Sequence, residues 1–261
     1  MKLNYETCIV GTKCVLVPYR PCHVTKYHEW MQQSFLLEMT GSEPLSLDEE
    51  VAMQQTWRDD DHKCTFIILA RDQCHFQPPQ QQEDDNNQVV PTTREDPDFC
   101  PCNLHAMVGD VNLFFSEEDP DDDHANDDDH VTSKPPQQPH QLQAELDIMI
   151  AEADYRGKGI GKEASCLMML YGVKIKNIRR FFCKIKETNH ASINLFETKL
   201  KFQQCGYAAC FQEVELELRH ESADSMTTHL QDLLGGDANV SSWNTFQCPV
   251  VTTNDNDNHD C

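Results

Sequence analysis

Apolar residues recur along the chain with two different spacings, which together predict alternating strands and helices. Short runs rich in β-branched and aromatic residues, such as CTFIILA at 64–70, are typical of strands. Runs of this kind predict strands at residues 12–19, 64–70, 105–115, 144–151 and 180–186, and two more within 202–218. Gly109 falls inside one of these strands and indicates a bulge there.

Helical spacing of apolar residues connects these strands. Helices are predicted at residues 21–31, 35–39, 46–57, 162–176 and 189–200. Pro21 suits the first position of the first helix, since its missing N–H has no helical partner there. Ser46 and Glu49 have the spacing of a capping box, and Asn189 is a suitable cap for the last helix.

Three segments lack any such pattern. Residues 77–103 are dominated by Gln, Pro, Asp and Asn, and within 116–143 the stretch from Glu117 to His130 holds nine acids and no Lys or Arg. Polar, like-charged segments of this kind do not fold alone, so both are expected to be disordered insertions. A disordered acidic tail is expected at 219–261. What is left, a domain over residues 1–218, is predicted to be an α+β fold around a mixed sheet.

Charge is distributed unevenly. The net charge of −23 disfavours a nucleic-acid partner, because most of the surface would repel phosphates. Between residues 156 and 201, however, eleven Lys or Arg face three Glu, a local balance of +8. This basic region is either a solvated surface or the surroundings of an anion site. No segment has the apolar length of a membrane span, so no membrane partner is expected.

The thirteen cysteines are scattered, and the N-terminal residues lack the apolar run of a secretory signal. Reduced thiols in a cytoplasmic or nuclear protein are therefore expected. Cys166 and Cys183 lie among apolar residues and are predicted to pack in the core. Cys100 and Cys102 with His105 lack a second pair of ligands, so no metal is expected.

The most informative stretch is a glycine-rich turn between the strand at 144–151 and the helix at 162–176. Glycine allows successive backbone N–H groups to converge on one point, and the start of a helix adds free amides and a positive dipole end. This combination predicts a phosphate cradle, although a tight connection with exposed bases has the same composition. The spacing of Gly157, Gly159 and Gly161 matches neither a Walker loop nor a GxGxxG dinucleotide turn.

Arg156, Gly159 and Gly161 occupy the positions of the signature of the GNAT superfamily of acyl-CoA N-acyltransferases, which is Gln or Arg, two residues, Gly, one residue, then Gly or Ala. The chain resembles this superfamily in motif and in the order of elements, and within it the RimJ/RimL-like branch. The phrases VLVPY, SEPLSLDEE and AELDIMIAE resemble the eukaryotic N-acetyltransferase 9 family. The resemblance implies the GNAT fold, a central mixed, mostly antiparallel sheet flanked by helices.

The resemblance also implies acetyl-CoA as co-substrate and no metal. The amides from Arg156 to Gly161 would hold the CoA pyrophosphate, with Lys158 and Lys162 at the rim, and the strand before the turn would pair with the pantetheine arm. The implied donor-binding residues are Ile148, Met149, Ile150, Arg156, Gly157, Lys158, Gly159, Ile160, Gly161, Lys162 and Asn189.

Acetyl transfer from a thioester requires an uncharged amine and a group that removes its proton. Glu145 and Asp147 lie two residues apart on one face of the strand and are the candidate catalytic bases, whereas Glu43 is a candidate substrate-binding residue in a loop. Many relatives carry a tyrosine near position 196 to protonate the leaving thiolate. Phe196 stands there in this chain and cannot donate a proton.

The predicted function is acetyl transfer from acetyl-CoA to a protein or peptide amine by direct attack in a ternary complex. An N-terminal α-amine is favoured over lysine, because a larger fraction of it is neutral near pH 7. The acidic surface favours basic peptides. The alternative, motivated by Phe196 and the acidic segments, is a GNAT-fold binding or scaffolding protein with weak or no catalysis. The sequence does not define an oligomeric state.

Overall fold

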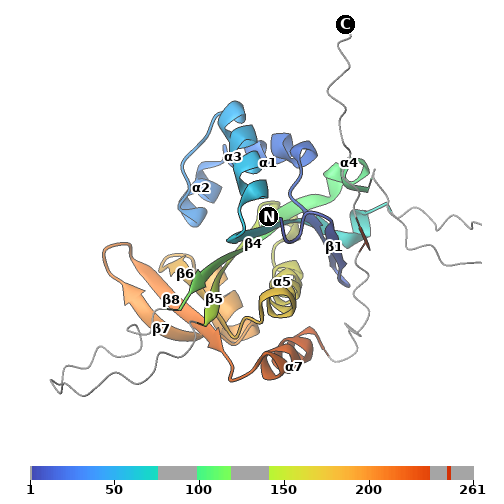
Figure 1. Ribbon diagram of the computed structural model, residues 1–261. Coiled ribbons are helices and arrows are strands. Elements are labelled where there is room, and N and C mark those ends of the chain that lie inside the picture. Colours follow the sequence, from blue (N-terminus) through green and yellow to red (C-terminus); the bar gives the residue numbers. More distant parts are fainter. Residues whose placement is uncertain (1, 76–98, 119–140, 236–245, 248–261) are drawn as a thin grey trace, which may run out of the picture.

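A nine-stranded sheet forms the centre of the protein (Figure 1). The computed structural model describes residues 2–75, 99–118, 141–235 and 246–247. The strand order is β7-β8-β6-β5-β4-β3-β2-β1-β9, and every pairing is antiparallel except that of β5 with β6. The strands are β1 Thr7–Val10, β2 Cys14–Pro18, β3 Lys63–Ala70, β4 Met107–Glu117, β5 Leu142–Ile150, β6 Arg180–Lys186, β7 Gln203–Ala208, β8 Glu213–Arg219 and β9 Phe246–Gln247. The expected mixed, mostly antiparallel sheet is confirmed.

Helices cover both faces of the sheet. Those in the described residues are α1 Val24–Trp30, α2 Ser34–Thr40, α3 Leu47–Asp59, α4 Phe99–Cys102, α5 Ile160–Lys176, α6 His190–Asn194 and α7 Ala223–Leu234. In Figure 1, α1, α2 and α3 lie on one side of the sheet and α5 and α7 on the other. The capping box of α3 is present, since Ser46 and Glu49 exchange hydrogen bonds as predicted. No helix in these described ranges is long and apolar enough to cross a membrane.

Strand register sorts the side chains into two cores. On one face, Phe66, Leu113 and Leu146 pack against α5, whose residues from Ile160 to Val173 are mostly buried. On the opposite face, Ile67 and Leu69 pack against the aromatic residues of α1. Because paired residues in an antiparallel sheet share a face, the polar residues of β3, β4 and β5 also gather on this second face.

The central feature is an incomplete pairing between β5 and β6. The two strands pair with each other in parallel only at Ala144 with Phe181 and at Glu145 with Phe182. Beyond these pairs the strands diverge, and in the described part of the chain no strand pairs with the β6-facing edge of β5 from Leu146 to Ile150.

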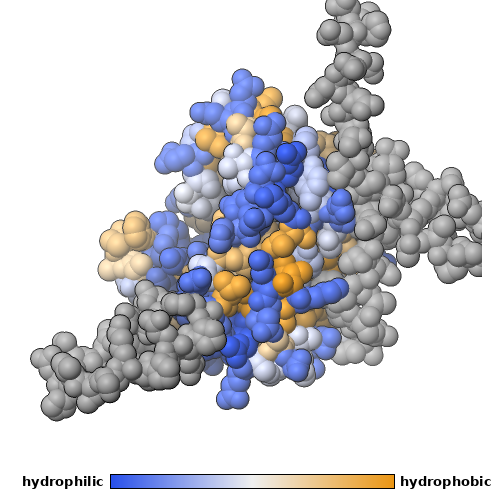
Figure 2. All heavy atoms as spheres, in the orientation of Figure 1, coloured by the Kyte–Doolittle hydropathy of each residue, from blue (hydrophilic) through white to orange (hydrophobic). Residues whose placement is uncertain are grey.

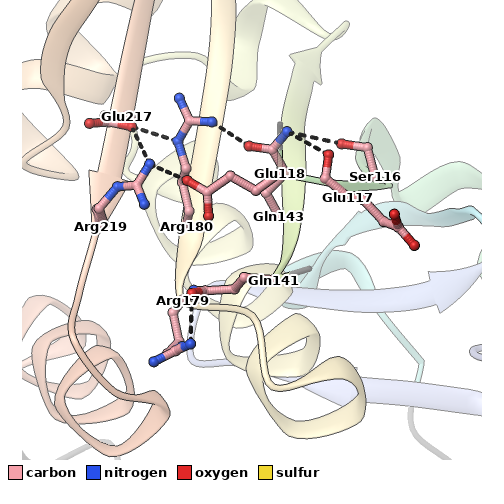
Figure 3. Close-up of polar contacts among 9 residues, drawn as sticks. All are labelled: Ser116, Glu117, Glu118, Gln141, Gln143, Arg179, Arg180, Glu217 and Arg219. Carbon is pink, nitrogen blue, oxygen red and sulfur yellow. Dashed lines mark hydrogen bonds and ion pairs between the residues drawn. The ribbon is translucent and has the colours of Figure 1, made fainter. Parts of the chain in front are cut away.

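Side chains hold the strands together at their paired end (Figure 3). Arg180 on β6 donates through Nε to Glu217 on β8 at 2.6 Å and through Nη1 to Gln143 on β5. Arg219 on β8 pairs with Glu118, which follows β4. These contacts cross the strands at one end only, so they fix the point from which β5 and β6 separate.

A bulge in β4 lies at the other end of β5. Ile68 pairs with Gly109 but Leu69 pairs with Met107, so Val108 is an extra residue, as Gly109 led us to expect. The Met149 carbonyl approaches Gly109 so closely that a Cβ there would lie 1.9 Å from its oxygen. Glycine is required at this position because of that approach.

Parts of the sequence-based prediction were wrong. Strand β1 was not predicted, and residues 99–102 form α4 although the whole of 77–103 was expected to be disordered. The ends of the second expected insertion, at 116–117 and 142–143, belong to β4 and β5. The largest error concerns the expected disordered tail, where α7 packs on α5 through Met226 and Leu230. The remainder of the two insertions and most of the tail lie outside the described residues.

We expect Leu230→Ala to lower the free energy of unfolding by about 2–5 kcal/mol, because Leu230 is fully buried between α7 and the core. Chemical denaturation of the full chain would measure this. Thr228→Ala, at an exposed position of the same helix, should change stability by less than about 0.5 kcal/mol. Equal stability of the two variants would show that α7 is not docked in solution.

Candidate active site

A cavity of about 370 Å³ opens where β5 and β6 diverge. Its walls come from both sides of the gap and from the helices above the second face of the sheet. Lining residues include Tyr27, Trp57, Lys63, Asp110, Asn112, Phe114, Glu145, Asp147, Ile148, Lys184, Asn189, Ser192 and Phe196. The cavity therefore connects the gap between the strands to the polar residues on the α1–α3 side.

The glycine-rich turn forms the expected cradle at the start of α5. Gly157 and Gly159 have φ angles of +74° and +85°, and Gly159 is the N-cap of the helix. Such angles are costly for residues with a Cβ. The backbone N–H groups from Gly157 to Lys162 donate to no acceptor within the described part of the chain. Six consecutive amides without acceptors fit an anionic ligand such as a diphosphate.

The β1–β2 turn is clamped onto this cradle. The Glu163 carboxylate, in the first turn of α5, accepts the amides of Lys13 at 2.7 Å and Cys14 at 2.9 Å, together with the amide and hydroxyl of Thr12. Burial alone would raise the pKa of Glu163, but these hydrogen bonds together lower it. The clamp presents the Lys13 side chain to the cradle, where Nζ donates to the Lys158 carbonyl at 2.9 Å.

Sequence reasoning missed Lys13. A Cβ at Gly159 would lie 2.6 Å from its Nζ, so the ammonium lies directly over the turn. Nothing near Lys13 in the sequence points to this role, because the contact joins residues about 145 positions apart.

Two basic side chains of the turn, those of Arg156 and Lys162, bind backbone carbonyls of the protein. Lys162 was expected at the rim of the cradle instead. The Arg156 guanidinium donates to the carbonyls of Ile150 at 2.8 Å and Ala151 at 2.7 Å, and its own amide donates to Ala153. Lys162 donates to the Leu233 carbonyl at the end of α7, 2.6 Å away. Arg156 therefore ties the turn to β5, and Lys162 ties it to α7.

The backbone of β5 presents alternate residues to the gap. The Ala151 amide donates to Val108 on β4, and the Met149 carbonyl also faces β4, next to Gly109. Because polar backbone groups alternate between the two edges of a strand, those of Ile148 and Ile150 face the gap instead. Of these, the Ile150 carbonyl already accepts Arg156, which leaves Ile148 as the central residue of the exposed edge.

Asp147 and Glu145 both line the cavity, as the prediction required. Asp147 is open to solvent through the cavity, yet protein surrounds it on most sides, and this partial burial, with Asp110 nearby, raises its pKa to about 6. Burial likewise raises the pKa of Glu145, followed by repulsion from Asp147. An acid with a pKa near 6 is a suitable general base at neutral pH.

Asp110 is a second acid that the sequence did not single out. It is 2% exposed, accepts Asn112 Nδ2 at 2.7 Å and is also hydrogen-bonded by Tyr27. Burial raises its pKa to about 6 despite these hydrogen bonds. Asn112 in turn accepts Thr65 Oγ1 at 2.7 Å, so the cavity floor is an ordered polar network. In sequence, Asp110 looked like an ordinary residue of a strand.

The remaining candidates divide between the cavity and the surface. Asn189 lines the cavity while its side chain caps α6 by accepting the Ser192 amide at 3.2 Å. Phe196 also lines it and is 2% exposed, with its ring edge-on to Phe202. Glu43 is exposed and does not line the cavity, whereas its neighbour Ser42 does.

Two buried cysteines lie near this site, and Cys183 lines the cavity. Cys166 and Cys183 are buried, as predicted, and burial raises the pKa of the Cys166 thiol to about 12. Across the described ranges, no group of three or more His, Cys, Asp or Glu side chains is placed to hold a metal ion.

Comparison with known proteins gives the family. A family model described as an acetyltransferase (GNAT) domain matches residues 13–203, which is most of the chain. The chain belongs to the GNAT acetyltransferase family. This GNAT protein is 39% identical over 240 residues to an N-acetyltransferase 9-like protein of Caenorhabditis briggsae, covering 92% of this chain and 98% of that relative. The resemblance inferred from the motif and the strand phrases is confirmed.

A mammalian relative is similar over most of its length too. The mouse protein named alpha/beta-tubulin-N-acetyltransferase 9 is 37% identical over 238 residues, covering 89% of this chain and 81% of that protein. Among solved structures, RimL, a ribosomal L7/L12 alpha-N-protein acetyltransferase, has a TM-score of 0.53 at 14% identity, covering 82% of this chain and 94% of RimL. The structural likeness supports the fold.

GNAT enzymes use acetyl-CoA, and the cradle of this domain fits its diphosphate.

Lys13→Met should raise the dissociation constant of acetyl-CoA about three- to tenfold, since it removes a partly exposed ammonium from a phosphate site. Binding of S-acetylpantetheine, which lacks the diphosphate, should not change. Isothermal titration of both donors would measure this, with Lys199→Met, on the exposed surface beyond α6, as the control. Equal weakening of both donors would argue against a phosphate contact.

Proposed function

We propose that this protein acetylates the N-terminal α-amine of a protein substrate, using acetyl-CoA in a ternary complex. The observation that supports the proposal is that one cavity includes both the gap between β5 and β6 and the side chains of Asp147 and Asp110. Acetyl-CoA bound in the gap and a substrate amine bound by these two carboxylates would meet in this cavity.

The donor side supplies backbone groups and cations. The amides of Gly157–Lys162 and the Lys13 ammonium would bind the diphosphate, and the Ile148 backbone would pair with the pantetheine amides. Asn189 and Ser192, at the start of α6, line the same gap. The 156–162 turn contributes to binding mainly through its backbone, because Arg156 and Lys162 bind protein carbonyls.

The acceptor side supplies the proton acceptor. The amine nitrogen attacks the thioester carbonyl, a C–N bond forms, the C–S bond breaks, and Asp147 takes the proton of the amine. We assign this role to Asp147 rather than Glu145 because Asp147 adjoins the polar network of Asp110 and Asn112. CoA leaves as a thiolate, which water can protonate given an ordinary thiol pKa of about 8.5. Phe196 takes no part in that step.

An α-amine suits a base of this strength. With a pKa of about 7.8, it is neutral in roughly a tenth of molecules at pH 7, whereas a lysine amine at about 10.4 is neutral in fewer than one in a thousand. Asp110, Glu145, Asp147 and Glu213 in the cavity outnumber Lys63 and Lys184, which favours a positively charged N-terminal segment. By analogy with the mouse relative's name, tubulin chains are the first substrates to test.

Mass spectrometry of protein N-termini tests the proposal. Tubulin and a proteome digest, incubated with acetyl-CoA and the protein, should gain acetyl groups on α-amines and not on lysines. Asp147→Asn should lower the rate by about 10²–10⁴-fold, because the base is lost while the shape is kept. Acetylation confined to lysine side chains would contradict the proposed acceptor.

The pH dependence of kcat/KM should identify the base. Activity requires deprotonated Asp147, whose pKa is about 6, and a neutral amine. The logarithm of kcat/KM should therefore rise with a slope of about two below pH 6 and about one between pH 6 and the amine pKa near 7.8. In Asp147→Asn the slope should be about one throughout. A slope of two that persists in this variant would assign the base elsewhere.

A further inference from the structure

Lys63 has an unusual position in the cavity. It lies on β3, is 4% exposed, and lines the cavity on the same sheet face as Asn112 and Asp147. Its Nζ lies 3.3 Å from the ring centroid of Trp57 and 4.0 Å from that of Phe114. Within the described residues the ammonium forms no hydrogen bond and no ion pair, so its contacts are aromatic faces.

Such an ammonium is incompletely satisfied. Two aromatic rings stabilise the charge, but they do not replace oxygen acceptors for its three N–H groups. Burial lowers the pKa of Lys63 to about 8, while Asp110 and Asp147 act in the opposite direction, so most molecules remain charged at pH 7. A buried, charged donor that faces a cavity points to an acceptor oxygen on the molecule that binds there.

The proposed substrate carries an oxygen in a suitable place. In an N-terminal residue the carbonyl is attached to the same carbon as the reacting amine, whereas a lysine side chain or an alkylamine has only methylene groups near its nitrogen. We infer that Lys63 is a specificity-determining residue that donates a hydrogen bond to the first carbonyl oxygen of the acceptor and thereby selects α-amines. This inference rests on the proposed function.

The surroundings of Lys63 are consistent with this role. With the amine bound by Asp110 and Asp147, as proposed, the carbonyl of the same residue would turn toward the ammonium on β3, because the carboxylates repel its oxygen and the ammonium attracts it. Trp57 and Phe114 lie against the ammonium itself, which keeps it in this part of the cavity.

Lys63→Met tests the inference because it keeps an apolar stem between the rings and removes every donor. The probes are a lysine-free peptide with a free N-terminus and the same peptide with an acetylated N-terminus and one added lysine. The ratio of their kcat/KM values, at saturating acetyl-CoA, should fall about tenfold or more in Lys63→Met. Lys184→Met, which removes a different lysine from the same cavity, should keep the ratio within about twofold.

A second measurement needs no folded variant. The wild-type protein should acetylate leucinamide at least about tenfold faster than 3-methylbutylamine, the same amine without its carbonyl, after both rates are corrected for the neutral fraction. An equal rate, or a peptide ratio that survives in Lys63→Met with an unchanged melting temperature, overturns the role of Lys63. A wild-type protein that acetylates no α-amine would overturn the proposed function itself.

Discussion

The incomplete parallel pairing of β5 with β6 is the constraint on which the site depends. Two residue pairs and a set of arginine contacts join the strands at one end, and beyond Glu145 the edge of β5 that faces β6 pairs with no strand among the described residues. An unpaired strand edge inside a sheet is unfavourable unless something else uses its polar groups. In this protein the gap forms part of a cavity lined by residues from both faces of the sheet, and an extended ligand backbone would complete the pairing.

The cradle and the cavity carry charges of opposite sign. At the cradle, free amides, the dipole of α5 and the Lys13 ammonium attract anions, and the Glu163 clamp holds Lys13 in place by neutral backbone contacts. On the α1–α3 side, carboxylates dominate and burial keeps two of their pKa values near 6. In the proposed reaction, this separation would let an anionic donor and a cationic acceptor enter from different sides. On the face seen in Figure 2, apolar areas interrupt the polar surface at the centre of the view and at the tip of the β7–β8 hairpin, where Phe211 is exposed.

Local signals in the sequence were most accurate where neighbouring residues alone determine the structure. The bounds of β6 follow from the alternation of apolar and basic residues at 180–186. The capping box of α3 follows from the three-residue spacing of Ser46 and Glu49. Helix α7 was missed because its leucines are too few to predict a folded segment from the sequence alone. Their packing with the residues of α5 is seen only in the structure. Lys162, expected beside a phosphate, instead donates to the end of that helix.

The sequence by itself determined the family and the order of most elements, because short motifs and local spacing of apolar residues identify both. Only the tertiary structure decided which charged side chains share the cavity. Lys63, Asp110 and Asp147 lie on three different strands, and a register shift of one residue would move any of them to the opposite face. The lowered pKa of Lys63, the raised pKa of Asp110 and the lack of an oxygen partner for Lys63 among the described residues follow from burial that the long-range strand pairing creates.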